Sequence, residues 1–251
     1  DLGLTHRDDA GADGGDDAPH VLVDDTMHAR FTQDLRGVLP DATFGLAGDV
    51  LAAMRVIKDD AEVAALRRAG EAADAVVREL RDDDVVGMTE AALAHHIEER
   101  LVANGGAGVS FETIVGSGPN GAMPHHTHGD RVIEAGDPVV LDFGTRVDGY
   151  PSDQTRTLVF GDAEPPEGFR EVHRVVREAQ AAAVEAVEPG GTTRAGDAPA
   201  REGIAGAGDG EGVGPPAGPR GGPGGHRGAP VGRAGERGLQ PRLVFPGEPA
   251  G

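Results

Sequence analysis

Two aspartates in the middle of the chain have the residue type and the spacing of metal ligands. Asp142 and Asp153 interrupt the apolar runs of "VVLDFGTRVDGYPSDQTRTLVFG", residues 139–161. An ionised carboxylate is costly to bury alone. Side chains that lie opposite each other on one face of a strand pair are about 5 Å apart. Two carboxylates at that distance repel each other unless a cation lies between them. Hard divalent cations prefer such oxygen ligands. The alternative is an exposed turn with two solvated aspartates.

Short strands around a tight turn are expected to position this pair. The runs "PVVLDFG" and "RTLVFG" have the composition of strands, and "TRVDG" between them is a glycine-containing hairpin signal. The upstream run "FETIVGSG" predicts another strand. Apolar residues at helical spacing predict a helix at residues 61–80, with Asp59 or Asp60 as the N-cap. They predict a second helix that begins after Thr89 as the N-cap and ends at about 105, and a third at about 168–187. This mixture indicates an α+β fold.

The two ends of the chain differ from its middle. Residues 1–20 are rich in Asp and Gly and predict a loop or disorder, and the short apolar runs that follow, up to residue 53, are too few for a domain of their own. We expect them to be the end of a domain that begins upstream. Residues 190–251 hold about half of the glycines and prolines, which predicts disorder or a linker.

Charge excludes several classes of partner. The chain has 43 acidic against 23 basic residues, a formal net charge of −20, and its single lysine is Lys58. Such a surface repels nucleic acid and anionic lipid. The many aspartates and the near absence of lysine favour a halophilic protein over an ordinary acidic one. With no cysteine, no signal segment and no long apolar run, the sequence predicts a cytoplasmic protein without disulfides.

Three motifs resemble those of the pita-bread metallopeptidase family, which includes Xaa-Pro dipeptidases, Xaa-Pro aminopeptidases, methionine aminopeptidases and creatinase. They are "GSGPNGAMPHH" at residues 116–126, the Asp-x-Gly that begins at Asp142, and "SDQTRT" at residues 152–157. "MRVIKDDAEVAALRRA", residues 54–69, is similar to the first helix of the Xaa-Pro branch. The resemblance implies an α+β pita-bread catalytic domain over residues 54–251. It also implies that residues 1–53 are a partial remnant of an N-terminal creatinase/prolidase-type domain and a linker.

The resemblance also implies a set of site residues. In this family two divalent metal ions, here Mn, Co or Zn, are held by two Asp, a His and two Glu. Asp142, Asp153 and Glu248 match three of these five positions. His125 matches a histidine that contacts the substrate, where it can orient the scissile carbonyl, and His226 matches a second histidine on the substrate side. A hydroxide bridging the metals would be the nucleophile.

The last quarter of the chain departs from the family pattern. Pro219 falls on the position of the metal-binding histidine, and proline offers a metal no side-chain lone pair. The fifth ligand would lie beyond Gly251. Residues 190–251 are therefore interpreted as a degenerate and incomplete part of the domain, which should fold poorly and bind metal weakly.

A metal-dependent Xaa-Pro peptidase is the function that the resemblance implies. Its substrate would be a peptide with proline at the second position, and the bond before that proline would be hydrolysed. The family also implies a homodimer. The alternative is a non-catalytic pita-bread module that binds peptides or proteins, or the product of a decayed gene. Pro219 favours that alternative, and the intact Asp142, Asp153, His125 and Glu248 speak against it.

Overall fold

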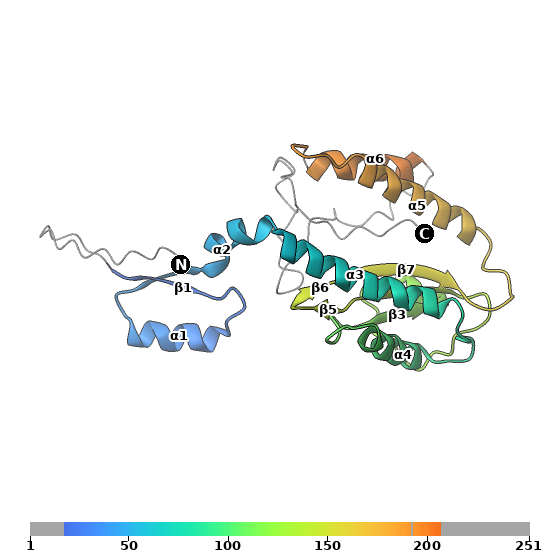
Figure 1. The fold of residues 1–251 in the computed structure, drawn as a ribbon, viewed down its shortest axis with the longest axis horizontal. Helices are drawn as coiled ribbons and strands as arrows, with labels where there is room; N and C mark the ends of the chain where they lie inside the picture. Colours follow the sequence, from blue (N-terminus) through green and yellow to red (C-terminus); the bar gives the residue numbers. More distant parts are fainter. Residues whose placement is uncertain (1–17, 192, 207–251) are drawn as a thin grey trace, which may run out of the picture. The chain divides into compact units, whose positions relative to one another are not determined.

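The computed structural model describes residues 18–191 and 193–206 of the chain (Figure 1). Contacts divide the chain into two compact units, Asp1–Met54 and Arg55–Gly251. The division lies one residue from the boundary predicted between residues 53 and 54. It does not identify what either unit is, so the two domain assignments stay predictions.

The first unit contains a β-α-β arrangement. Strands β1 (His20–Val23) and β2 (Thr43–Leu46) pair in parallel, and helix α1 (Ala29–Val38) connects them. A parallel pair needs such a crossover, and this is why the apolar runs of the segment alternate between strand and helix. Helix α2 (Ala47–Val56) follows β2 directly. Most of the segment predicted to be a loop or disordered lies outside the described residues.

Two predicted helices form the helical layer of the second unit. Helix α3 (Asp60–Leu80) begins at a capping box: the Asp59 carboxylate accepts from the Glu62 N–H, and the Glu62 carboxylate accepts from the Asp59 N–H. Of the two predicted caps, Asp59 is therefore the one used. Helix α4 (Glu90–Ala103) is capped by the Thr89 hydroxyl, as predicted. Among the residues that the structure describes, no helix is long and apolar enough to cross a membrane.

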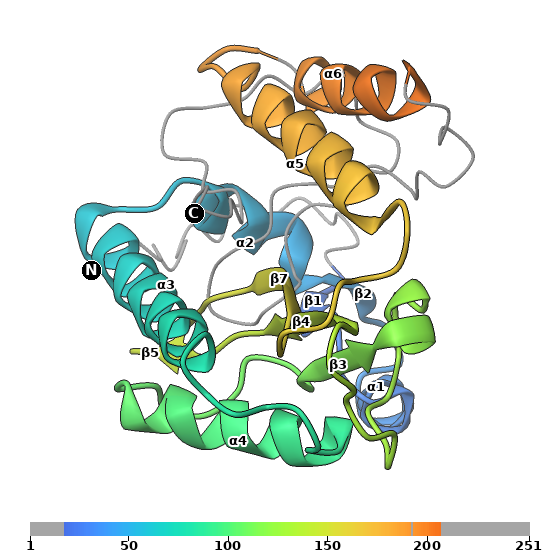
Figure 2. The same ribbon diagram turned by 90° about the vertical axis from the view of Figure 1, so that its right-hand side faces the viewer.

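Helices α3 and α4 cover one face of an antiparallel sheet (Figure 2). The sheet has the order β3-β4-β7, with β3 at Ile114–Ser117, β4 at Pro138–Phe143 and β7 at Gln154–Val159. The core between helices and sheet contains Ala73, Val76, Val77 and Leu80 of α3, Leu93, Ala94, Ile97 and Leu101 of α4, Val115 of β3, and Val139, Leu141 and Phe143 of β4. Because side chains alternate along a strand, the register places another set on the opposite face, called the aspartate face below: Ile114, Gly116, Val140, Asp142, Thr155 and Thr157.

A tight hairpin lies between β4 and β7, as predicted. Strands β5 (Arg146–Val147) and β6 (Tyr150–Pro151) pair across a two-residue turn. Both turn residues have positive φ, 51° at Asp148 and 84° at Gly149. This backbone twist matches the twist of the flanking strands, and Asp-Gly is a favoured sequence for it.

The helix predicted at about 168–187 is confirmed as α5 (Phe169–Glu185), but the prediction for the next segment is wrong. Residues 193–206 were expected to be disordered or a linker, and they form helix α6 (Thr193–Gly206), with Pro199 inside it. Helix α6 packs on α5, where Ala179 is buried close to Gly203. Small side chains let the two helices approach closely, so tertiary packing outweighs the low helix propensity of this segment.

Candidate metal centre

Asp142 lies on the aspartate face of β4. Along this strand Val139, Leu141 and Phe143 are buried in the core, whereas the alternating residues, Asp142 among them, are only partly buried. The Thr155 hydroxyl, directly opposite on β7, donates to Asp142 Oδ1 at 3.0 Å. The carboxylate is therefore held on the side of the sheet that α3 and α4 leave uncovered.

Asp153 comes directly before β7 and lies diagonally across from Asp142. Thr155 is the residue paired with Asp142, and Asp153 precedes Thr155 by two positions. The alternation of buried and partly buried residues puts Asp153 on the same face as Thr155. The prediction that the two aspartates lie directly opposite each other, about 5 Å apart, is therefore wrong. They are diagonal neighbours, and the Cα atoms of such neighbours are about 7–8 Å apart. A diagonal pair leaves room for a cation between the carboxylates.

Close backbone contacts before β7 set this offset. The Ser152 hydroxyl accepts from the Thr145 N–H at 3.0 Å, and the Ser110 hydroxyl donates to the Ser152 carbonyl at 2.7 Å. A Cβ at Gly144 would overlap that carbonyl oxygen, so only glycine fits. Ser152 of the "SDQTRT" motif thus holds the chain in place immediately before Asp153.

Helix α3 anchors the same segment from the core side. The Gln154 side-chain amide donates to Asp74 Oδ1 at 2.7 Å, and the Tyr150 hydroxyl donates to Glu62 Oε1 at 2.8 Å. The hairpin and the start of β7 are therefore tied to one helix on both sides of Asp153. The carboxyl groups beside Tyr150, chiefly that of Glu62, raise the pKa of its phenol, so the hydroxyl stays a donor at neutral pH.

The two aspartates fit a metal centre in chemistry but do not complete one. Carboxylate oxygens are suitable ligands for hard divalent cations. Within residues 18–191 and 193–206, however, there is no group of three or more His, Asp or Glu side chains able to hold a metal ion. The described part of the chain therefore supplies two carboxylates, those of Asp142 and Asp153, to the candidate metal centre. Glu248, His226 and Pro219 lie outside the described residues.

The loop that carries His125 begins on the aspartate face. It opens with a short 3-10 helix, η1 (Gly118–Ala122), which packs on β3 and β4. A Cβ at Gly116 would lie 3.0 Å from the Asn120 carbonyl oxygen, and a Cβ at Gly121 would lie 3.2 Å from Val140 Cγ2. Two glycines thus let η1 lie directly on the face that carries Asp142.

His125 itself is exposed, and its side chain makes no hydrogen bond or ion pair with the residues that the structure describes. Its neighbours differ. His126 bonds Glu90 at 2.8 Å, and His128 Nδ1–H donates to the Thr113 carbonyl at 2.9 Å. The rings of these two histidines are therefore bonded within the protein, and His125 is the one whose ring is available to a ligand.

Glu90, at the start of α4, is a residue that the sequence reasoning missed. Its side chain is fully buried. Its Oε1 accepts from the Ser117 N–H at 2.8 Å, the Ser117 hydroxyl at 2.7 Å and the Asn120 amide at 2.9 Å. Its Oε2 accepts from His126 and, at 3.4 Å, from the Gly129 N–H. In the sequence it resembles any acidic residue of a first helical turn, because all these partners come from a distant segment.

The charge on Glu90 is stabilised by these donors. Burial by itself would raise the pKa of the carboxyl, but hydrogen bonds from His126, Ser117 and Asn120 outweigh it and lower the pKa to about 2. An ionised carboxylate only accepts hydrogen bonds, so the His126 Nε2 must carry a proton. The group is thus a buried anion that orders the loop around it.

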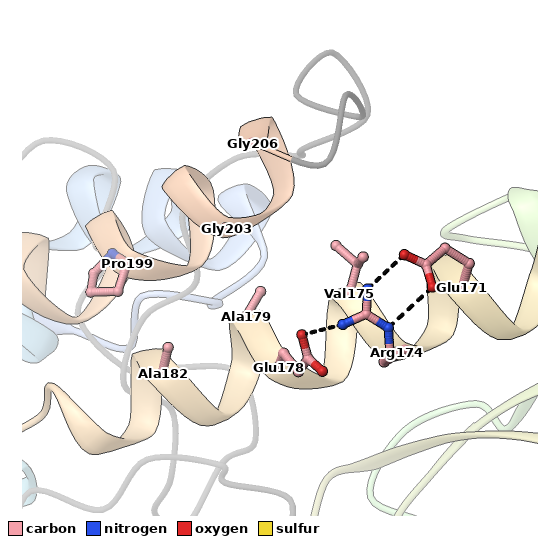
Figure 3. Close-up of a pocket in the computed structure, with 9 residues that line it drawn as sticks. All are labelled: Glu171, Arg174, Val175, Glu178, Ala179, Ala182, Pro199, Gly203 and Gly206. Carbon is pink, nitrogen blue, oxygen red and sulfur yellow. Dashed lines mark hydrogen bonds and ion pairs between the residues drawn. The ribbon is translucent and has the colours of Figure 1, made fainter.

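A separate hollow of about 400 Å³ lies between α5 and α6 (Figure 3). Its polar rim on α5 is formed by Arg174, which pairs with Glu171 and Glu178 at 2.6 Å each. The rest of its lining is mainly small or apolar, with Ala179, Ala182 and Gly203 labelled in Figure 3. None of the predicted site residues lines it, so it is not the candidate centre.

Known proteins are similar to this chain both in sequence and in fold. The probable dipeptidase PepE of Mycobacterium tuberculosis is 44% identical over 183 residues, which cover 72% of this chain and 47% of that protein. The Xaa-Pro dipeptidase of Pyrococcus horikoshii is 35% identical over 189 residues, covering 75% and 53%. The chain thus spans about half the length of these relatives.

Solved structures extend the likeness to 90% of the chain. The prolidase of Pyrococcus horikoshii has a TM-score of 0.82 at 32% identity, and the X-Pro aminopeptidase of Thermotoga maritima one of 0.78 at 30%; each match covers 64% of the solved chain. The predicted α+β pita-bread fold is confirmed by these structures. The family model of metallopeptidase family M24 matches residues 64–250. Sequence and fold therefore agree that this chain belongs to metallopeptidase family M24.

Proposed function

We propose that this chain acts as a metal-dependent peptidase that hydrolyses the bond before proline in peptides with proline at the second position. The observation that carries the proposal is the placement of Asp142 and Asp153 on one face of the β4–β7 pair, the face from which the His125 loop starts. Relatives named Xaa-Pro dipeptidase support the substrate class.

Each residue has a defined task in this proposal. Asp142 and Asp153 would hold divalent ions, Mn, Co or Zn, together with Glu248. When bound, such ions supply Lewis acidity and an activated water. The exposed His125 would donate a hydrogen bond to the scissile carbonyl and stabilise the charge that develops there, and His226 would contact the substrate from the other side. A cytoplasmic location, a homodimer and halophilic adaptation stay predictions.

Metal binding and hydrolysis test the proposal together. Titrating the full chain with Mn²⁺ by calorimetry should reveal binding that Asp142→Asn and Asp153→Asn each weaken roughly tenfold or more, because each removes a charged ligand. The Mn²⁺-loaded chain should hydrolyse Ala-Pro and leave Ala-Ala intact. Asp148→Asn is the matched control: Asp148 lies exposed in the turn of the same hairpin, and Asn tolerates its positive φ.

The second candidate is a non-catalytic module that binds peptides or proteins, and Pro219 favours it. In that case the chain would bind Ala-Pro without added metal and would not hydrolyse it with Mn²⁺. Equal Mn²⁺ affinity in the wild type and in both Asp→Asn variants would also count against the peptidase.

A further inference from the structure

The segment 120–126, which contains His125, begins in η1, which packs on β3 and β4, and continues into an exposed stretch. Two successive turns form its backbone: the Met123 N–H donates to the Asn120 carbonyl, and the His126 N–H donates to the Met123 carbonyl, each at 3.1 Å. Residues 122–125 are exposed. The two side chains that anchor the segment to the core, Asn120 and His126, both bond the same group, the Glu90 carboxylate.

The downstream end of the loop is held differently. The backbone N–H of Glu90 donates to the Arg131 carbonyl and that of Ala91 to the Gly129 carbonyl, each at 3.0 Å, so the free donors of the first turn of α4 bind residues 129–131. These bonds do not depend on the side chain at position 90. Removing the carboxylate should therefore release the middle of the loop and leave its downstream end in place.

The upstream end adds a further link to the same carboxylate. The Ser117 hydroxyl donates to Glu90 and accepts from Arg131 Nη1 at 2.8 Å, and Arg131 in turn pairs with Asp137 at 2.7 Å. Ser117 is also held in the ladder of β3 with β4, opposite Val139. One buried anion therefore connects the end of β3, the middle of the loop and the N-terminus of α4.

We propose that Glu90 is a positioning residue, whose buried carboxylate holds Asn120 and His126 and thereby fixes the position of His125, which lies between them in the chain. His125 has no partner of its own among the described residues, so its placement depends on its neighbour His126. The proposal rests on the proposed function only for the task of His125 at a substrate. The positioning itself is independent of catalysis.

The test compares three variants of the full chain. Glu90→Gln keeps the size of the side chain and removes its charge. His126→Ala removes one anchor from the loop and keeps Glu90. Glu79→Gln is the matched control. Glu79 also accepts hydrogen bonds from α4 and its C-cap, from Arg100 and Asn104, but in the described part of the chain it bonds no residue of the loop.

The main readout is the nuclear magnetic resonance of the histidine rings, selectively labelled with ¹⁵N. In the wild type, His126 should show the Nε2–H tautomer. Glu90→Gln and His126→Ala should each shift the His125 ring signals, whereas Glu79→Gln should not. The exposed His95 of α4, whose ring pairs with Glu99 of the same helix at 3.4 Å, serves as the internal reference. A general loss of stability does not move the resonances of the native state, so these shifts report position.

Hydrogen exchange supplies a second measurement. Amides of residues 120–126 should exchange roughly tenfold faster in Glu90→Gln and His126→Ala, while those of β4 and the middle of α4 stay within about twofold of the wild type. The proposal is overturned if the His125 signals and the loop exchange are unchanged in both variants, or if Glu79→Gln changes them equally. If Glu90→Gln does not fold, His126→Ala alone decides.

Neither readout requires catalysis, so the two proposals fail separately. If the wild type does not hydrolyse Ala-Pro, the proposed function is refuted. The histidine spectra and the hydrogen exchange still test the positioning role of Glu90. In a protein that does hydrolyse Ala-Pro with Mn²⁺, Glu90→Gln and His126→Ala should lower kcat/KM roughly tenfold. Glu79→Gln should lower the melting temperature and leave kcat/KM unchanged.

Discussion

At the scale of single residues, the two most informative groups are both buried or partly buried carboxylates, and the fold treats them differently. Glu90 is surrounded by donors from the protein itself, so its charge is satisfied inside the described structure. Asp142 accepts from the Thr155 hydroxyl and, like Asp153, is only partly buried, on the face that α3 and α4 leave uncovered. A carboxylate that is enclosed by donors of the protein, like that of Glu90, is typical of a structural anion. Two partly exposed carboxylates on one face of a sheet are typical of metal ligands.

The depressed pKa of Glu90 predicts how stability depends on pH. A group whose pKa falls from about 4.5 to about 2 on folding stabilises the protein above pH 4.5, and this contribution, about 3 kcal/mol, is lost as the pH falls toward 2. Gln at position 90 does not titrate. The difference in the free energy of urea unfolding between the wild type and Glu90→Gln should therefore shrink by about 2 kcal/mol from pH 6 to pH 3. A constant difference would mean that the carboxyl is not held as an anion.

Pro219 provides a second prediction at this scale. If the resemblance aligns it correctly with the metal-binding histidine, Pro219→His adds an imidazole ligand to the carboxylates. Calorimetry should then show Mn²⁺ affinity roughly tenfold or more above that of the wild type. Pro216→His, three residues upstream, is the control and should leave the affinity unchanged. An equal effect of both variants, or of neither, would argue against the alignment.

At the scale of elements, the site depends on how closely η1 lies against the sheet. Gly116 of β3 makes this approach possible, because any side chain there would press on the backbone of Asn120 and Gly121. The contact folds η1 back over the end of β3, the strand that it follows, and so brings it against β4 as well. It also makes η1 sensitive to a change of a single methyl group.

A pair of Gly→Ala variants tests this contact. Gly116→Ala should lower the free energy of unfolding by about 1–3 kcal/mol, since backbone must move to make room. Gly70→Ala, within α3, meets nothing within 4 Å and should raise it by about 0.5–1 kcal/mol, because Ala favours a helix over Gly. Urea unfolding of both variants measures the two effects. Stabilisation by Gly116→Ala would contradict the close approach of η1.

At the scale of the whole molecule, net charge is the dominant property. A formal charge of −20 on 251 residues gives strong self-repulsion, which salt screens. Acidic residues outnumber basic ones in both units, 11 against 3 in residues 1–54 and 32 against 20 in residues 55–251, so the effect concerns the chain as a whole. The self-repulsion cannot be assigned to any single pair of charges.

Salt dependence is therefore the prediction for the whole molecule. The free energy of unfolding should rise between about 0.1 M and 2 M KCl, with most of the gain at the low end, where the Debye length shortens from about 10 Å to a few ångströms. KCl is preferred to sulfate, which stabilises most proteins by exclusion from their surface. Stability that is flat or falls with KCl would remove the halophilic interpretation.

The sequence by itself determined the elements and the family. Caps at Asp59 and Thr89, helical spacing of apolar residues and the Asp-Gly turn are local signals, and they predicted α3, α4 and the hairpin correctly. The motifs around His125 and Asp153 are equally local, and they led to the fold that the solved structures share. Local chemistry suffices where the neighbours of a residue in sequence are also its partners in space.

Only the tertiary structure decided the rest. The diagonal relation of Asp142 and Asp153 follows from the strand register, and α6 forms because it packs against α5 despite its Gly and Pro. Glu90 is recognisable as a buried anion only through donors that are 27–39 residues away. These features depend on contacts between distant segments, and burial and hydrogen bonding there override what each residue prefers alone.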